Sequence, residues 1–231
     1  MNKKISVIIP VLNEAAVIGR TLQQFSGISS DTIPHEIIVV DGDNKGNTIR
    51  AIKNPNIITG TTYRGRSTQM NHGASLASGT ILLFLHADTL LPPNSLQKIT
   101  NTLSGTPAEW GAFDLGIAST RSVYRLIEAA VRLRTAITHI PYGDQAVFLT
   151  RDLFDRAGEY PQIPIMEDVA LMRRVRKLGA VGCRIPEKVS TSPRRWETEG
   201  IVYCTLRNWF LLACYLLGAS PEALVKYYRS K

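Results

Sequence analysis

The sequence predicts an α/β fold with a mainly parallel central sheet, and two observations support this. First, strand-like apolar runs alternate with helix-like segments over the first ninety residues, which is the pattern of parallel strands joined by right-handed crossovers. Second, the run from Ile81 to Leu85 is apolar at every position, as expected of a strand buried on both faces. With 231 residues and 44% hydrophobic content, the chain can build one such domain.

The elements expected in residues 1–91 are short apolar strands that end in proline or polar turn residues. Asn13 is expected to cap the first helix, because asparagine is a favoured N-cap residue. No Gly-x-Gly-x-x-Gly or Walker motif follows a strand, which argues against a dinucleotide or P-loop site. In chain order the expected elements are strand 5–10, helix 13–25, strand 36–40, short helix 47–52, strand 56–59, helix 67–77 and strand 81–85.

The second part of the chain is expected to be more helical. Residues 122–137 place apolar side chains on one broad helical face and arginines on the remainder. The polar stretch 191–196 is expected to be a flexible loop, and no composition break marks a linker. We therefore expect a single domain, residues 1–231, with a helical C-terminal extension. The expected elements are helix 95–103, strand 110–115, helix 122–137, strand 143–149, helix 166–178, strand 180–181, helix 201–217 and a final helical turn or two from 221.

The composition limits the kinds of partner that the protein is expected to bind and indicates its cellular location. A net charge of +8 invites nucleotide phosphates, nucleic acid or an anionic membrane surface. No zinc-ligand spacing, RNA-binding aromatic pattern or clustered lysine run is present, so nucleic acid is not expected. Cys183, Cys204 and Cys214 form no Cys-x-x-Cys pair and are expected to be reduced thiols of a cytoplasmic protein. The first apolar run has six residues, too few for a signal peptide.

The end of the strand at Ile81 carries the first candidate site. His86 and Asp88 are two positions apart, so on an extended backbone their side chains leave on the same face. Ligands of open α/β sheets bind beyond the carboxyl ends of strands, and a hard divalent ion needs oxygen ligands placed there. The alternative is that Asp88 only caps the turn before Pro92 and Pro93.

Four short motifs, in this order and spacing, resemble those of family 2 glycosyltransferases. They are Val7 to Glu14, Ile38 to Gly42, His86 to Asp88, and Glu167 with Asp168. The likeness extends from Ser6 to about Gly179. It implies a GT-A fold that binds a nucleotide-sugar on its N-terminal half. The His-Ala-Asp-Thr and Arg-Arg-Trp sequences are similar to those of a subgroup of small bacterial members of the family.

The resemblance divides the chain into three functional parts. Residues 1–91 would bind the nucleotide-sugar, residues 92–190 would hold the acceptor and the catalytic groups, and residues 191–231 would form a basic loop and C-terminal helices. In the donor part, Asp41 would accept from the N–H of the base, usually uracil. Its alternative role is that of an ordinary turn aspartate.

Other residues of the donor part receive roles from the same resemblance. Pro10, Asn13 and Glu14 would line the pocket for the base. Arg66 could reach the donor phosphates through forked hydrogen bonds, unless it is a solvated surface arginine. Asn71 could face the nucleotide from its helix, and a packing role is its alternative.

In the resemblance, Asp88 matches the last residue of the family's Asp-x-Asp motif, which ligates Mg²⁺ or Mn²⁺ against the diphosphate. The metal would act as a Lewis acid on the departing nucleoside diphosphate. His86 departs from the pattern, because an aspartate is common at its position. Imidazole suits Mn²⁺ better than Mg²⁺, which leaves the identity of the metal open. His86 is a candidate second ligand, and its alternatives are a supporting role beside the metal or a packing role.

Asp168 is the candidate general base, since the aspartate of the family's Glu-Asp motif takes the proton from the acceptor hydroxyl. Glu167 precedes it, and the alternative is that the pair only complements the dipole of its helix. Asp144 could orient the sugar or the acceptor. A single displacement would invert the anomeric centre. The loop with Arg194, Arg195 and Trp196 could clamp the diphosphate once the donor is bound, or be a solvated basic loop.

Two rival functions are considered. A phosphohydrolase of the haloacid dehalogenase type would need a nucleophilic carboxylate where this chain has His86. The other rival is a non-catalytic protein that binds a nucleotide-sugar or a membrane surface. The apolar segment 207–217 is shorter than a membrane span. Together with 122–137, it could lie at the inner face of the plasma membrane and serve a lipid-linked acceptor, or it could pack on the core.

Overall fold

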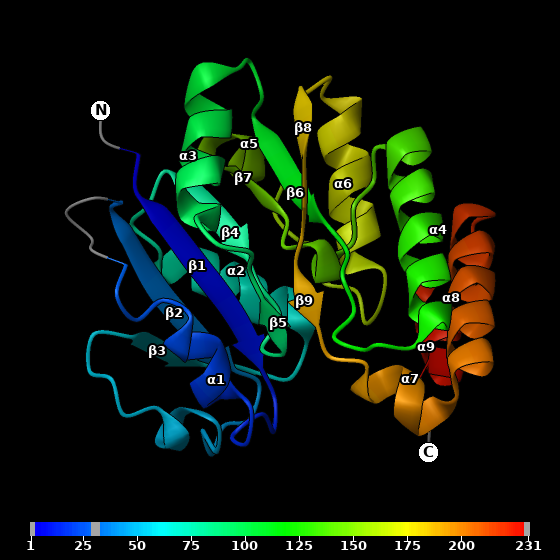
Figure 1. Cartoon of the computed structure of the whole chain (residues 1–231), viewed down its shortest axis with the longest axis horizontal. Helices are drawn as coiled ribbons and strands as arrows, with labels where there is room; N and C mark the ends of the chain where they lie inside the picture. Colours follow the sequence, from blue (N-terminus) through cyan, green and yellow to red (C-terminus); the bar gives the residue numbers. More distant parts are fainter. Residues whose placement is uncertain (1–2, 29–32, 229–231) are drawn as a thin grey trace.

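The computed structural model describes residues 3–28 and 33–228 and contains a seven-stranded sheet that is parallel in its N-terminal half. β1 lies between β2 and β4 and is parallel to both, and β3 is parallel to β2. β7 enters antiparallel between β4 and β6, and β8 is parallel to β6. The sheet order is β3 (Ile58–Thr61), β2 (His35–Asp41), β1 (Ile5–Val11), β4 (Ile81–Phe84), β7 (Phe148–Thr150), β6 (Trp110–Asp114) and β8 (Gly182–Lys188) (Figure 1).

Helices cover both faces of this sheet, and a small two-stranded sheet made of β5 (Thr89–Leu90) and β9 (Ser190–Thr191) joins the end of β4 to the C-terminal part. In Figure 1 the C-terminal helices lie at the far edge from β3. The helices are α1 (Ile18–Gln23), η1 (Ile49–Ala51), α2 (Arg66–Leu76), α3 (Ser95–Gly105), α4 (Ser122–Thr138), η2 (Gly143–Gln145), α5 (Arg151–Arg156), α6 (Glu167–Lys177), α7 (Arg194–Glu199), α8 (Ile201–Leu216) and α9 (Pro221–Tyr228).

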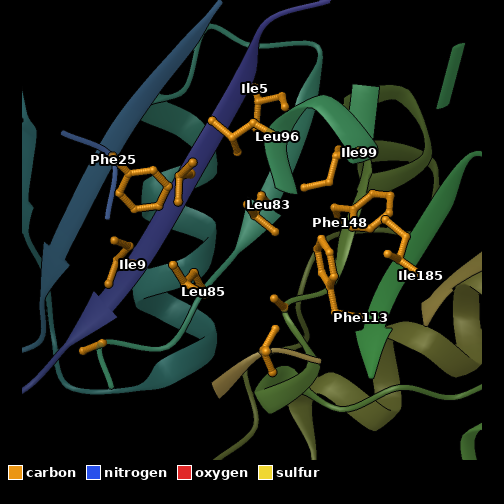
Figure 2. Packing of buried hydrophobic residues seen from close by; sticks show 14 of the residues in the cluster. Ile5, Ile9, Phe25, Leu83, Leu85, Leu96, Ile99, Phe113, Phe148 and Ile185 are labelled. Carbon is orange, nitrogen blue, oxygen red and sulfur yellow. The ribbon is translucent and has the colours of Figure 1, made fainter. Parts of the chain in front are cut away.

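Two large apolar clusters, one on each face of the sheet, make up most of the core of the described residues, and a small third cluster contains Ile165, Leu211 and Leu224. Successive strand residues point to opposite faces, so Ile81 and Leu83 join one cluster while Leu82 and Phe84 join the other. Figure 2 shows the first cluster, where α1 and α3 pack on β1 and β4. On the other face, α2, α5 and α6 pack on the same strands. Burial on both faces explains the continuous apolar sequence of β4.

The strand and helix alternation predicted for residues 1–91 is confirmed, but the first helix begins later than expected. It starts at Ile18, after a turn segment, and Val17 rather than Asn13 is its N-cap. Asn13 has a left-handed backbone, with φ at 58°. The N–H of Glu14 donates to Thr48 Oγ1 at 3.1 Å, which holds this segment at the end of β1 instead of in a helix.

The second half differs more from the expectations. The strand expected over 143–149 is the short helix η2 followed by β7, because the chain turns sharply at Ala146 (φ 47°). The strand expected at 180–181 starts later and is longer, because β8 begins at Gly182 and leaves Ala180 and Val181 outside it. Residues 194–196 lie in α7 and not in a flexible loop. Helix α5, which no apolar pattern predicted, begins at Arg151 and is capped by Thr150, whose side chain accepts from the N–H of Leu153.

Candidate active site

The candidate site lies where the carboxyl ends of β1 and β4 meet the first residues of α6 and α7. Glu14 follows β1, Asp88 follows β4, Asp168 is in the first turn of α6, and Arg194 begins α7. Arg66, at the start of α2, lies within electrostatic range of both Asp88 and Asp168. The structure therefore gathers the predicted metal ligand, phosphate ligand and general base in one region, at the strand ends where open α/β sheets bind ligands.

Asp88 is a half-buried carboxylate with a second carboxylate nearby. β4 ends at Phe84, and Ala87 and Asp88 form a turn. Burial raises the pKa of Asp88, and the negative charge of Glu14 raises it further, while the positive charge of Arg194 opposes the shift. A neighbouring carboxylate that disfavours the ionisation of Asp88 suits a divalent cation, which would relieve the repulsion.

A metal held only by protein side chains is not supported in the part of the chain that the structure describes. No group of three or more histidine, cysteine, aspartate or glutamate side chains in residues 3–28 and 33–228 is arranged to hold an ion. The residues fit instead an ion that takes one or two protein oxygens and shares its other positions with water and substrate phosphates, as Mg²⁺ commonly does.

Glu14 and Arg194 form a forked ion pair across the site. Arg194 Nη2 and Nη1 donate to the two carboxylate oxygens of Glu14 at 2.7 and 3.2 Å. The side chain of Arg194 is 56% exposed, so solvent reaches the pair. The Asp88 carboxylate attracts the same guanidinium. Arg194 thus lies beside the predicted metal ligand, where a diphosphate would compete with Glu14 for its donors.

The two residues after Arg194 face elsewhere. The guanidinium of Arg195 lies 3.9 Å from the ring centroid of Tyr228 and pairs with Glu199 at 3.4 Å. Trp196 packs edge-on against Tyr124, with 6.1 Å between ring centroids. Of the three residues expected to clamp the diphosphate, the structure places only Arg194 beside Asp88; the other two fasten α7 to α9 and α4.

His86 lies beside Gly143 and Asp168. A Cβ added at Gly143 would come within 2.8 Å of His86 Nε2 and 3.7 Å of Asp168 Oδ2, so both groups border one small space. Because residues 87–88 turn, the extended backbone that would put His86 and Asp88 on one face is absent. Burial, and then the positive charge of Arg66, lowers the pKa of His86 to about 3. The imidazole is therefore neutral, and its Nε2 is buried with no hydrogen-bond partner among the described residues.

Asp168 is held in place by backbone donors. Its Oδ2 accepts from the N–H of Gly143 at 2.9 Å, and its Oδ1 accepts from the N–H of Val169 at 2.8 Å. The preceding Glu167 is buried, and burial raises its pKa although Arg66, 3.6 Å away, opposes the shift. Asp168 thus has a fixed orientation with lone pairs left for a substrate, while Glu167 holds Arg66.

Asp144 occupies the η2 turn, next to a group of residues that the sequence did not reveal. Burial raises the pKa of Asp144 to about 6, and its Oδ1 is buried with no partner among the described residues. The guanidinium of Arg134 lies 3.3 Å from the ring centroid of Tyr142 and donates to Gln145 at 3.0 Å. The Pro-Tyr-Gly sequence marked the turn, but nothing local pointed to Arg134 on α4.

The remaining predicted site residues support the loops around the site. Asp41 is fully buried, and its two carboxylate oxygens accept from the N–H groups of Asp43 and Thr48, each at 3.0 Å. The Asn71 amide donates to and accepts from the backbone of Tyr160. These contacts match the alternative roles of a turn aspartate and a packing asparagine. Pro10 is half-buried at the end of β1, and Asn13 is exposed.

Comparison with known proteins identifies the family of the chain. A model of glycosyl transferase family 2 matches residues 6–160. A PGL/p-HBAD biosynthesis glycosyltransferase of Mycobacterium bovis is 32% identical over 179 residues, which cover 67% of this chain and 62% of that protein. A probable glycosyltransferase of Sulfolobus acidocaldarius is 30% identical over 131 residues, or 50% of this chain and 28% of that protein. The chain thus spans less than two thirds of either relative.

Solved structures share the fold at low sequence identity. A Pyrobaculum calidifontis mannosyltransferase in complex with GDP-Man and Mn²⁺ superposes with a TM-score of 0.65 at 21% identity, covering 83% of this chain and 57% of that one. Staphylococcus aureus TarS 1–349 with UDP-GlcNAc gives 0.62 at 16%, covering 82% and 58%. The chain has the GT-A fold and belongs to glycosyl transferase family 2.

Proposed function

We propose that the protein is a metal-dependent inverting glycosyltransferase that moves a sugar from a nucleotide-sugar, by family resemblance a UDP-sugar, to an acceptor hydroxyl. The observation that carries this proposal is the convergence of Asp88, Arg66 and Asp168 at the carboxyl ends of the sheet. These residue types match the three needs of the reaction: a cation site, a phosphate ligand and a proton acceptor.

For the donor, Asp88 with its neighbour Glu14 would hold Mn²⁺ or Mg²⁺. When bound, the ion supplies Lewis-acid stabilisation of the charge that grows on the departing nucleoside diphosphate. Arg66 and Arg194 would contribute guanidinium donors to the phosphate oxygens. Arg194 can exchange its carboxylate partner for a phosphate without leaving the site, because its pair with Glu14 is exposed to solvent.

For the acceptor, Asp168 would take the proton of the attacking hydroxyl. The N–H of Gly143 fixes one of its oxygens, which limits the positions from which a hydroxyl can approach. The neutral His86 imidazole and the Asp144 carboxyl, each with an unpaired buried atom, would hydrogen-bond the sugar or the acceptor. A single displacement of this kind inverts the anomeric centre and forms no covalent enzyme intermediate.

Several finer assignments belong to the same proposal. Residues 1–91 would bind the donor and 92–190 the acceptor. The His-Ala-Asp sequence would place the chain in a subgroup of small bacterial members that work in the cytoplasm. The two ligand-bound neighbours carry different bases, GDP-Man in one and UDP-GlcNAc in the other, so UDP rests on the family resemblance alone.

A thermal-shift panel tests the proposal. Nucleoside diphosphates and nucleotide-sugars are added with and without Mn²⁺, and a ligand that binds only the folded protein raises Tm. We expect the largest shift with UDP or a UDP-sugar plus metal, followed by release of free UDP from the best donor, with inversion read by NMR of the product. Donor binding without any UDP release, with a range of acceptor alcohols present, would instead favour the non-catalytic binder. A panel without any shift would contradict both.

A further inference from the structure

The outer face of α8 is apolar along its whole length. Trp209 is 52% exposed and Phe210 64%. Leu217, directly after the helix, is 89% exposed. Between residues 201 and 216 the sequence has one charged side chain, Arg207. A solvent-facing helix surface normally carries the polar residues, so this face is unlike that of a helix meant for water. The exposed large apolar residues of the segment are Val202, Tyr203, Leu206, Trp209, Phe210, Leu216 and Leu217.

The only charge of α8 is turned inward. Arg207 is buried, with 8% of its surface exposed, and it pairs with Glu199 at 2.5 Å. Its guanidinium also lies 5.4 Å from the ring of Tyr203 and 5.5 Å from the ring of Tyr228. The helix is therefore apolar on both sides: its charge lies inside together with the buried Cys204 and Leu211, and its outer face carries apolar side chains without charge. Burying a charge is costly, and the arrangement frees the outer face of charge.

Helix α4 also exposes apolar side chains. The buried side of α8 faces α4, because Tyr124 of α4 lies within electrostatic range of Cys204, and Figure 1 shows both helices at the same edge of the molecule. Leu126, Leu133 and Ile137 of α4 are exposed. Their spacing of seven and four residues places them on one side of the helix.

A cationic pocket adjoins this surface between α6 and the end of α8. Its volume is about 370 Å³, and no carboxylate among the described residues lines it. The guanidinium of Arg173 lies 6.0 Å from the ring of Tyr215, and the exposed Leu216 and Leu217 follow Tyr215 directly. Positive charge and exposed apolar side chains thus meet at one end of α8. The lining residues are Pro161, Ile163, Ala170, Arg173, Arg174, Lys177, Tyr215 and Pro221.

We propose that this surface docks on an anionic phospholipid bilayer, with the outer side chains of α8 in the interfacial layer and a lipid phosphate in the cationic pocket. Tryptophan and tyrosine favour the headgroup region, and juxtaposed cations add attraction to anionic lipid. In the described residues no helix is long and apolar enough to cross a membrane, which fits docking in the interface.

Charge favours a bilayer over a second copy of the chain. A two-fold dimer through the same face would bring the cationic pockets of both copies toward the shared interface, where like charges repel. An anionic lipid surface neutralises them instead. The proposal does not depend on sugar transfer, and vesicle binding tests it separately.

The test is flotation of the full chain with neutral phosphatidylcholine vesicles and with vesicles that also contain phosphatidylglycerol. Trp209→Ser with Phe210→Ser should lower partitioning by roughly tenfold to 100-fold, because their apolar surface leaves the interface. Tyr63→Ser is the matched control, since Tyr63 is 79% exposed in the connection between β3 and α2, at the opposite edge of the sheet. This control should bind like the wild type.

The cationic pocket is tested with a second pair of substitutions. Arg173→Gln with Lys177→Gln should lower binding to the anionic vesicles by about tenfold or more and leave binding to neutral vesicles little changed. Arg50→Gln with Lys53→Gln removes the same charge from an exposed site near β3 and should have a much smaller effect. Circular dichroism confirms that each variant folds.

Three results would overturn the proposal. The first is a wild-type chain that does not float with anionic vesicles at low salt. The second is equal binding by the wild type and the Trp209 and Phe210 double variant. The third is a wild-type dimer in light scattering that this double variant converts to a monomer, with no vesicle binding, which would identify a second copy as the partner.

Discussion

The two ends of the parallel strands differ in whether their buried polar groups have hydrogen-bond partners. At the amino ends of β1, β2 and β4, Glu36 accepts from Lys4 Nζ, from Ser6 Oγ and from the N–H of Ser78, each at 2.6 Å. Burial alone would raise the pKa of Glu36, but these donors outweigh it and lower the pKa to about 2. The amino end is a satisfied polar network, which fixes the strands relative to each other.

At the carboxyl ends, Asp41 is satisfied by backbone donors, but other buried polar groups around the candidate site are left without such partners. His86 Nε2 and Asp144 Oδ1 have none among the described residues, and burial raises the pKa of Asp88 and of Asp144. An unpaired buried polar atom costs about 1–3 kcal/mol, so a folded chain keeps it where a ligand supplies the missing partner. One end of the sheet thus stabilises the fold, and the other end holds the unpaired groups that we propose to meet the substrate.

The largest expected effect is that of Asp168→Asn at the carboxyl end. Loss of the general base should lower kcat by roughly 10² to 10⁴-fold, while donor binding persists because the amide keeps the size of the carboxylate. Turnover is measured as UDP release in the presence of acceptor, and binding is measured by thermal shift. If the variant also loses donor binding, Asp168 is a structural residue, and at this position the carboxyl end does not differ from the amino end.

The next effect comes from Gly143→Ala. The added Cβ would lie 2.8 Å from His86 Nε2, so the imidazole that borders the same space as the Asp168 carboxylate must move. We expect a loss in turnover of about tenfold or more, since small displacements of reacting groups are costly. Gly105→Ala is the control, because a Cβ there meets nothing within 4 Å. Equal turnover by Gly143→Ala and Gly105→Ala would show that the position of His86 beside Asp168 does not affect the reaction.

At the amino end, Glu36→Gln should change stability and not activity. A carboxyl whose folded pKa is lowered stabilises above its unfolded pKa, and this contribution is lost as the pH falls from about 4.5 toward 2. We expect a loss of about 2 kcal/mol in the free energy of unfolding at pH 7 and a smaller loss at pH 3.5. Urea denaturation measures both, and an unchanged donor-induced Tm shift confirms that the amino end is separate from the site.

The smallest effect has the opposite sign. The pKa of Asp144 is raised to about 6, so its ionisation destabilises the fold as the pH rises from about 4 through 6. Asp144→Asn cannot ionise and should gain about 1 kcal/mol relative to the wild type at pH 8, with no gain at pH 4. Urea denaturation at the two pH values checks this. A gain of equal size at both values would show that ionisation of Asp144 is not its origin.

The sequence predicted the parallel half of the sheet well, because strands buried on both faces leave long apolar runs such as Ile81 to Leu85. It missed the antiparallel insertion of β7, since the pairing of Leu83 with Phe148 is a long-range choice without a local signal. The cap predicted at Asn13 was wrong for a related reason. The sequence alone does not distinguish an asparagine with a left-handed backbone from one that caps a helix. The contact of Glu14 with Thr48 holds this segment in the left-handed form.

Within the site, the sequence supplied residues but not their partners. Asp88, Arg66 and Asp168 come together as expected, whereas the partner of Arg194 is Glu14, 180 positions away, and no spacing rule reveals such a pair. The same applies to Arg134, which stacks on Tyr142 and supports the turn that carries Asp144. Sequence motifs show which chemical groups are present, whereas long-range contacts determine which of these groups face the candidate site.

The most direct test of the account is calorimetric titration of UDP with and without Mn²⁺ into the wild type, Asp88→Ala and the exposed-site control Asp155→Ala. We expect Mn²⁺ to tighten UDP binding by the wild type and by Asp155→Ala, and Asp88→Ala to bind UDP with no gain from the metal. Equal tightening in all three proteins would contradict the assignment of Asp88 and, with it, the view that the carboxyl ends of the strands hold a metal-bound donor.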